Sequence, residues 1–380
     1  IIFNRMTDNE QIKNSQDDID ENVSYRSNEN DLINNVLKND RKKDLLDCLL
    51  GCAYGQALGD AYGLSTEFQT VAHIKNLYPN PVELIPFPNY IPNSHACRWR
   101  KGDWTDDTDQ WILVMEALME PDNNAKMFAR KLSLWVRQGF PEFNDFGGLG
   151  LGINVAKVIN SSGYLENPLE ASRIVWEESN RQVAPNGAVM RCSSSGIVNY
   201  NDIEKVKSSA ISMCQTTHFD PRCVASCVSI CLAIAYMLQT PDNSDIESLI
   251  ARVQQETLDT LGHDLSPQYQ EEFLWHTSKD RTLDDLRLDD ERVIGYTYKC
   301  LASGFYGLRS TRSFSETLND LIRHGGDADT NGAVCGTMYG VRYGYHSLPT
   351  EWLQAMPYKK WFDQKILHLL EHMNLINGTT

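Results

Sequence analysis

The chain has 380 residues, of which 51 are Asp or Glu and 35 are Lys or Arg, so its formal net charge is −16. Hydrophobic residues make up 41 %, which is enough for a large core and excludes disorder of the whole chain. The acidic excess argues against general nucleic-acid binding, because such proteins need Lys and Arg to displace counterions from phosphates. It argues equally against docking on anionic lipid. We therefore expect neither nucleic acid nor a membrane as a partner.

The composition changes once along the chain. Residues 1–42 are rich in Asn, Asp, Glu and Ser and poor in apolar residues, so they predict a solvated tail, with partner binding as an alternative. Residues 43–380 predict one domain. Apolar and small residues recur there at helical spacing, and period-two strands are hard to find. The predicted helices span residues 45–64, 111–120, 125–136 and 296–308, with an irregular loop over 78–92 and peripheral helices and loops over 241–292.

The segment from Pro221 to Leu238 approaches the length of a membrane-spanning helix, roughly 18–20 residues. However, Asp220 followed by Pro221 is typical of a helix start in a soluble domain. Arg222 and two serines interrupt the apolar run, and no basic cluster flanks it to set an orientation. We therefore predict a buried core helix.

The ten cysteines are too sparse for a disulfide scaffold in a chain of this size. Cys223, Cys227 and Cys231 recur every four residues and therefore share one face of a helix. Cysteines in that position usually act as small buried hydrophobes, and a metal site is the alternative interpretation. This cysteine usage predicts a reducing compartment, the cytoplasm, with the nucleus as an alternative.

A first acidic cluster, Gly102-Asp-Trp-Thr-Asp-Asp-Thr-Asp109, runs directly into the predicted helix 111–120. Acidic residues often cap a helix start, because they complement the helix dipole. Three or more carboxylates exceed what capping requires, and they repel one another. A cation would relieve this repulsion, and oxygen ligands suit a hard cation such as Mg²⁺, Mn²⁺ or Ca²⁺.

A second cluster, His324-Gly-Gly-Asp-Ala-Asp-Thr-Asn331, again places Asp and Thr oxygens at the start of a helix. That helix carries glycines at 332, 336 and 340, a strip along which another helix can approach closely. Membrane dimerisation through such a strip is disfavoured by the nearby Asp and Arg residues. An Asp-x-Asp motif alone is weak, but two such helix starts could surround a pair of adjacent ions.

Three further residues have both a structural and a functional interpretation. Glu67 lies in a glycine-punctuated segment, and it is either solvated or able to orient or deprotonate water near a metal. Pro185-Asn186-Gly187 predicts a turn, whose backbone N–H groups can bind phosphate. His218 precedes Asp-Pro, where a histidine is often structural.

These segments together resemble the ADP-ribosylglycohydrolase family. The resemblance covers most of residues 44–348, and its motifs occur in the family's order: GCAYGQALGDAYGLSTEF, GDWTDDTDQ, APNGAVMR, THFDP and GGDADTNGAVCGTMYGVRYG. It implies an all-α fold, a single large orthogonal helical bundle with a dinuclear Mg²⁺ or Mn²⁺ centre in a cleft. It also implies ADP-ribose or an ADP-ribosylated protein as the substrate. We expect a monomer.

The resemblance also implies roles for individual residues. Glu67 takes the place of the family's loop glutamate and is the expected catalytic residue. We expect Asp103 and Asp109 to fix the metal ligands from outside. The implied metal ligands are Thr105, Asp106, Asp107, Asp327, Asp329 and Thr330. The implied substrate-binding residues are Asn186, Gly187, His218, Gly150 and Gly152.

One segment departs from the family pattern. Many arginine-directed members carry Asp-Ile-Gly-x-Thr-Thr, whereas residues 147–154 read GGLGLGIN, with Asp145 nearby but out of register.

The expected function is hydrolysis of the glycosidic bond between ADP-ribose and a protein side chain, with arginine linkage favoured. The alternatives are a catalytically silent ADP-ribose-binding protein and a hydrolase of serine-linked or O-acetyl-ADP-ribose.

Overall fold

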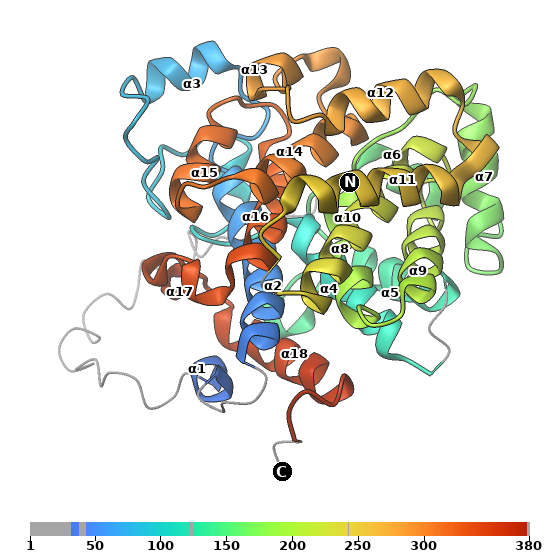
Figure 1. Cartoon of the computed structure of the whole chain (residues 1–380), viewed down its shortest axis with the longest axis horizontal. Helices are drawn as coiled ribbons and strands as arrows, with labels where there is room; N and C mark the ends of the chain where they lie inside the picture. The colour runs from blue at the N-terminus through green and yellow to red at the C-terminus, as the bar shows by residue number, and fades with distance from the viewer. Residues whose placement is uncertain (1–31, 38–42, 122–124, 242, 378–380) are drawn as a thin grey trace.

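The computed structural model describes residues 32–37, 43–121, 125–241 and 243–377, which form α-helices joined by loops and short 3₁₀ turns (Figure 1). No β-strand occurs in these ranges, only the isolated bridges Gln69–Gly326 and Pro185–Tyr296. The predicted all-α class is therefore confirmed. The helices are α1 (Leu32–Leu37), α2 (Lys43–Gly63), α3 (Val71–Leu77), α4 (Asp106–Met119), α5 (Ala125–Gln138), α6 (Ile153–Ile159), α7 (Pro168–Glu178), α8 (Ser193–Val198), α9 (Ile203–Gln215), α10 (Pro221–Gln239), α11 (Ile246–Leu261), α12 (Pro267–Thr277), α13 (Leu283–Leu286), α14 (Thr297–Arg309), α15 (Phe314–Ile322), α16 (Ala328–Tyr343), α17 (Thr350–Ala355) and α18 (Lys359–His372).

The predicted helices agree with α2, α4, α5 and α14 to within a few residues, except at the start of α4. This helix begins at Asp106 and not at residue 111, because the Thr105 side chain accepts a hydrogen bond from the Asp107 N–H and caps it there. Asp106, Asp107 and Asp109 of the first acidic cluster therefore lie inside the first turn. The segment 78–92 is irregular, as predicted. Helices α11, α12 and α13 occupy much of 241–292, towards the outside of the molecule (Figure 1).

The predicted tail lies outside the described residues except for α1, which contacts α2 and α18. Ile33 and Leu37 stand one helical turn apart, and both are buried. These residues therefore pack against the domain and are not solvated, because two apolar side chains at this spacing form one buried face. The structure does not test the remainder of the tail prediction.

Helix α10 is the helix in the described ranges that is long and apolar enough to cross a membrane by length and composition alone. In this fold 94 % of its apolar window is buried inside the protein. Its three cysteines are fully buried, and the Cys231 thiol donates to the Cys192 carbonyl oxygen at 3.0 Å. All ten cysteines are free thiols. The predicted core helix is thus confirmed, and its cysteine face is part of the packing.

Helices α2 and α16 are the most extensively packed pair among the described helices, and they lie side by side in Figure 1. Glycines of α2 at 51, 55 and 59 face glycines of α16 at 340, 336 and 332. A Cβ placed at Gly336 would lie 2.1 Å from the Gly55 carbonyl oxygen, and one at Gly55 would lie 2.2 Å from the Gly336 carbonyl oxygen. The two backbones touch, so no larger residue fits at these positions.

This contact predicts a stability defect. Gly336→Ala places a methyl group against rigid backbone, so the helices must separate, and the free energy of unfolding should fall by about 2–3 kcal/mol. Urea denaturation measures this change. The control is Gly152→Ala, because the position is open and φ is −64°; its effect should stay below about 0.5 kcal/mol. Equal stability of Gly336→Ala and the unsubstituted protein would show that the two helices can move apart freely.

Candidate metal centre

The two glycine-faced helices run in opposite directions, so the end of α2 meets the beginning of α16. A Cβ at Gly63 would lie 2.1 Å from the carbonyl oxygen of Ala328. The last turn of α2 carries Asp60, and Glu67 follows in the next turns. The start of α16 carries Asp327 and Asp329. Helix packing therefore brings together carboxylates more than 250 residues apart in the sequence.

The carboxylates form two groups that share Asp329. One group is Asp60, Asp107 and Asp329, and the other is Glu67, Asp327 and Asp329. Within each group one oxygen per residue lies within 4.8 Å of the others. Oxygen-only donors at this spacing fit a hard divalent cation such as Mg²⁺ or Mn²⁺. Two groups with one shared residue fit a pair of neighbouring ions.

Asp60 holds the start of α4 and was not recognised as a site residue from the sequence. Its Oδ1 accepts a hydrogen bond from the Thr105 N–H at 3.0 Å. Its Oδ2 accepts from the Thr108 N–H at 3.0 Å and from the Thr108 hydroxyl at 2.6 Å. Asp60 thus fixes the turn that carries Asp107. In the sequence, Asp60 stands near the end of the predicted helix 45–64. This position does not distinguish it from other acidic residues in helices.

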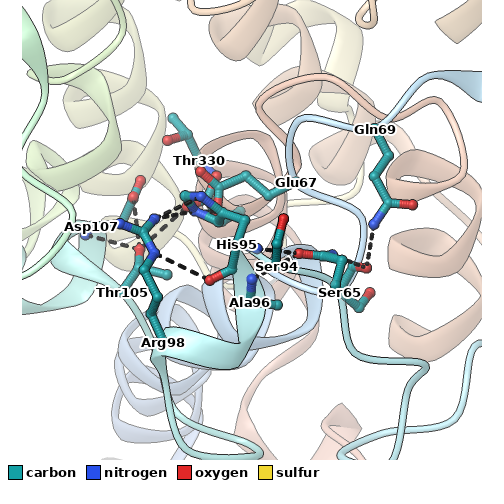
Figure 2. Close-up of polar contacts among 12 residues, drawn as sticks. Ser65, Glu67, Gln69, Ser94, His95, Ala96, Arg98, Thr105, Asp107 and Thr330 are labelled. Atoms are coloured by element: carbon teal, nitrogen blue, oxygen red, sulfur yellow. Dashed lines mark hydrogen bonds and ion pairs between the residues drawn. The ribbon is translucent and has the colours of Figure 1, made fainter. Parts of the chain in front are cut away.

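Thr105 and Thr330 contact carboxylates of this cluster, and Figure 2 labels both threonines together with Asp107 and Glu67. The Thr105 hydroxyl lies 3.1 Å from Asp107 Oδ2 and 3.4 Å from Asp329 Oδ2. The Thr330 N–H donates to Asp329 Oδ1 at 2.8 Å. Asp107 Oδ1 is buried and accepts no hydrogen bond from the part of the chain that the structure describes. A buried oxygen without a donor is costly unless a cation or water binds it.

Burial and mutual repulsion shift the pKa of these carboxyl groups. Burial raises the pKa of Asp107 and Asp329 well above the usual value, and neighbouring carboxylates raise it further. Burial raises the pKa of Asp60 to about 7, although the hydrogen bonds from Thr108 and Thr105 oppose the shift. A cation reverses this trend, because it stabilises the ionised form. The donor set therefore fits a bound metal better than a cluster of bare carboxylates.

Glu67 is 6 % exposed, and its Oε2 lies 2.8 Å from His95 Nε2 (Figure 2). Burial raises the pKa of the Glu67 carboxyl, and the hydrogen bond from His95 opposes this shift. His95 lies in the irregular segment between α3 and α4. Sequence reasoning missed it, because that segment has no periodic pattern and no motif that points to Glu67.

The predicted site residues, with the exception of Thr105, line one cavity of about 1020 Å³. Asn186 is joined to the carboxylate cluster, because its Nδ2 donates to Asp327 Oδ2 at 2.9 Å. His218 stands beside Gly187, where a Cβ would lie 3.1 Å from His218 Nε2. Burial, followed by the charge of Arg191, lowers the pKa of His218 well below 6.5, so the ring is neutral. Its buried Nε2 has no hydrogen-bond partner among the described residues.

Asp106 lines the cavity but belongs to neither three-carboxylate group within the described ranges. Its Oδ2 accepts a hydrogen bond from Gln110 Nε2 at 2.6 Å. Its Oδ1 faces Gly150, where a Cβ would lie 2.2 Å away and where φ is +102°. Glycine at 150 is therefore required both by the backbone conformation and by the space. Gly152 faces open space on the same loop.

The structure also places Asp103 and Asp109, the acidic residues that we expect to fix the metal ligands from outside. Asp109 accepts hydrogen bonds from the indole N–H groups of Trp104 at 2.7 Å and Trp135 at 3.2 Å. Asp103 Oδ1 accepts from the Trp104 backbone N–H at 3.0 Å. The Asp109–Trp135 contact joins α4 to α5, and the role of Asp103 and Asp109 towards the metal stays a prediction. Asp145 accepts from the Phe140 N–H at 2.9 Å and stabilises a turn.

Comparisons with known proteins agree with this arrangement. The chain matches the family model ADP-ribosylglycohydrolase over residues 41–377. It therefore belongs to the ADP-ribosylglycohydrolase family. A solved structure described as an ADP-ribosylglycohydrolase-related protein complex superposes with a TM-score of 0.64 at 22 % identity, covering 87 % of this chain and 99 % of that one. The fold predicted from the sequence is thus confirmed.

Relatives with stated functions are distant in sequence. The ADP-ribosylarginine hydrolase Tri1 of Serratia proteamaculans is 23 % identical over 265 residues, which cover 68 % of this chain and 64 % of that enzyme. The ADP-ribosyl-[dinitrogen reductase] glycohydrolase of Rhodospirillum rubrum is 20 % identical over 298 residues, which cover 78 % and 86 %. A protein of Archaeoglobus fulgidus is 26 % identical over 334 residues, which cover 83 % and 94 %.

The role of Asp60 yields a prediction. Both carboxylate oxygens of Asp60 accept hydrogen bonds from N–H groups at the start of α4. In Asp60→Asn one of these oxygens becomes an NH₂ group, which cannot accept, so a buried hydrogen bond is lost. We expect the free energy of unfolding to fall by about 2 kcal/mol and Mn²⁺ to bind more weakly. Urea denaturation and Mn²⁺ titration test this. The control is Asp44→Asn, at an exposed position in the first turn of the same helix. Unchanged stability and Mn²⁺ affinity would contradict the role.

Proposed function

We propose that this protein is a divalent-cation-dependent hydrolase that releases ADP-ribose from a modified protein side chain, with arginine-linked ADP-ribose as the favoured substrate. One observation carries the proposal: four carboxylates of the two groups that share Asp329 line the same cavity as Asn186, Gly187 and His218, and only Asp60 stands behind them. The four are Glu67, Asp107, Asp327 and Asp329. The cavity, about 1020 Å³, is large enough for a dinucleotide-sized ligand. Family membership and the names of the two bacterial glycohydrolase relatives support the reaction class.

The donor set supports two ions, Mg²⁺ or Mn²⁺. Asp60, Asp107 and Asp329 offer one group of oxygens, and Glu67, Asp327 and Asp329 offer the other. The Asp106 carboxylate and the Thr105 and Thr330 hydroxyl groups are the remaining donors that the family resemblance assigns to the metal. When bound, the cations supply positive charge that holds the ribose hydroxyls and offsets charge at the bond that breaks.

Glu67 is the residue of this chain that we assign to the attacking water molecule. Hydrolysis breaks the bond between the anomeric carbon and the side-chain atom, and the oxygen of water replaces that atom. One proton of the water stays on the new hydroxyl group, and the other is passed to the departing side chain. Glu67 is a carboxylate that lines the cavity beside Asp327 and Asp329, so it can reach a water at the site. Glu67 therefore orients the water and accepts its proton.

The loops on the other side of the cavity bind the ADP-ribose moiety. The neutral His218 presents an unpartnered Nε2 beside Gly187. Asn186 Nδ2 is bonded to Asp327, so this loop and the carboxylates keep a fixed relative position. Gly152 borders open space, so the ligand can approach its backbone. Together these groups position the sugar in front of Glu67.

The linkage prediction is tested with a panel of defined substrates. Protein with Mg²⁺ or Mn²⁺ is incubated with arginine-linked and serine-linked ADP-ribosyl peptides and with O-acetyl-ADP-ribose, and released ADP-ribose is quantified by chromatography. We expect the fastest release from the arginine-linked peptide. Preference for another member of the panel would contradict the arginine assignment. Tight binding of ADP-ribose without release from any substrate would contradict the enzyme and support a binding protein.

The metal prediction is tested at the residue that both carboxylate groups share. Asp329→Asn keeps the acceptor for the Thr330 N–H but removes the negative charge, so turnover and the rise in melting temperature on Mn²⁺ addition should disappear together. Treatment with a chelator should have the same effect on the unsubstituted protein. Asp280→Asn, at an exposed and distant position, is the control. Normal turnover of Asp329→Asn would show that the groups do not hold the metal.

A further inference from the structure

We propose that His95 is a positioning residue that holds the Glu67 carboxylate in its working orientation. This inference rests on the proposed function and extends it to a residue outside every motif of the sequence. His95 Nε2 lies 2.8 Å from Glu67 Oε2, and the Glu67 side chain is 6 % exposed (Figure 2). The contact joins the irregular segment before α4 to the turns that follow α2.

The Arg98 guanidinium lies beside both ring nitrogens of His95. Arg98 Nη2 lies 2.6 Å from His95 Nδ1 and 3.0 Å from Nε2, and Arg98 Nε donates to the His95 carbonyl oxygen at 3.2 Å. A guanidinium group can only donate hydrogen bonds, and the nearer nitrogen, Nδ1, is its better acceptor. This arrangement leaves Nε2 to face Glu67 Oε2 at 2.8 Å. Oε2 accepts no well-aligned hydrogen bond from the described residues, so the link between the two side chains is a close polar contact.

The His95 ring itself is fixed from several directions. Asn93 Oδ1 accepts hydrogen bonds from the N–H groups of His95 at 2.9 Å and Ala96 at 2.8 Å. The Phe68 ring packs against His95 with centroids 4.8 Å apart at 82°, and the Trp99 ring lies 5.2 Å away. These contacts remove freedom from the ring before any substrate binds, so the ring keeps a defined position against the Glu67 carboxylate.

Hydrogen bonds of the two neighbouring residues hold the backbone at Glu67, so the freedom that remains to Glu67 lies in its side-chain torsions. Phe68 has φ +58°, an unfavourable value for this residue, and its N–H donates to the Gly326 carbonyl oxygen at 2.7 Å. The Thr66 hydroxyl donates to the Ile322 carbonyl oxygen at 2.8 Å. A displacement of about 1 Å in a reacting group can cost on the order of 100-fold in rate. His95 therefore restrains the side-chain torsions of Glu67, which the backbone contacts leave free.

The kinetic test compares two substitutions at one position. His95→Ala removes the donor, and kcat should fall about 10- to 100-fold with little change in KM. His95→Gln supplies an amide N–H near the place of Nε2 and should restore most of the lost kcat. Both variants should keep the rise in melting temperature on Mn²⁺ addition. His73→Ala, at an exposed position on α3, is the matched control.

Two kinetic outcomes would overturn the inference. An unchanged kcat in His95→Ala would show that Glu67 needs no restraint from this ring. Equal losses in His95→Ala and His95→Gln would show a general disturbance of the loop and not a lost hydrogen bond.

A second measurement does not depend on turnover. In protein labelled with nitrogen-15 histidine, the His95 ring should be protonated at Nε2, and its signal should change in Glu67→Ala but not in His73→Ala. An unaffected His95 signal in Glu67→Ala would overturn the inference by itself. If the unsubstituted protein releases ADP-ribose from no substrate, the proposed function fails, and this measurement alone decides whether His95 restrains Glu67.

Discussion

The close approach of α2 and α16 is the constraint on which the rest of the site depends. Because glycine faces glycine along the whole contact, the two backbones touch and their relative position is fixed to a fraction of an ångström. The antiparallel direction places the end of α2 against the start of α16. Asp60 and Glu67 thereby meet Asp327 and Asp329 without any flexible linker between them and the core.

The site concentrates negative charge, and the fold offsets only part of it. The starts of α4 and α16 direct their positive dipole ends towards the carboxylates. Hydrogen bonds to Asp60 and Asp329 supply further compensation. Burial still raises the pKa of these groups, so the ionised cluster lacks enough positive charge. Bound cations would complete the compensation, and the net charge of −16 is then compatible with a ligand that carries phosphates.

The sequence predicted the helical class and the core helix α10, because periodicity and capping are local properties. The residues that converge on the cavity were implied by the resemblance to the ADP-ribosylglycohydrolase family. It did not reveal what Asp60 and His95 do. Asp60 acts through the start of α4, 45 residues away, and His95 acts through an irregular loop. Both roles depend on tertiary contacts. The glycine strip of α16 at 332, 336 and 340 was visible in the sequence, but its partner strip on α2 becomes evident only when both helices are considered together.

Rigid and adaptable parts of the site come from different kinds of segment. The carboxylates stand on helix ends, whereas His95, Asn186 and Gly152 stand on loops or at the junction of a loop and a helix. Loops accept changes of sequence more readily than packed helices do. Gly150 is the place where the two parts touch, because any side chain there would meet the Asp106 carboxylate. Changes of sequence can therefore arise over residues 151–154, whereas Gly150 must stay small to leave room for the Asp106 carboxylate of α4.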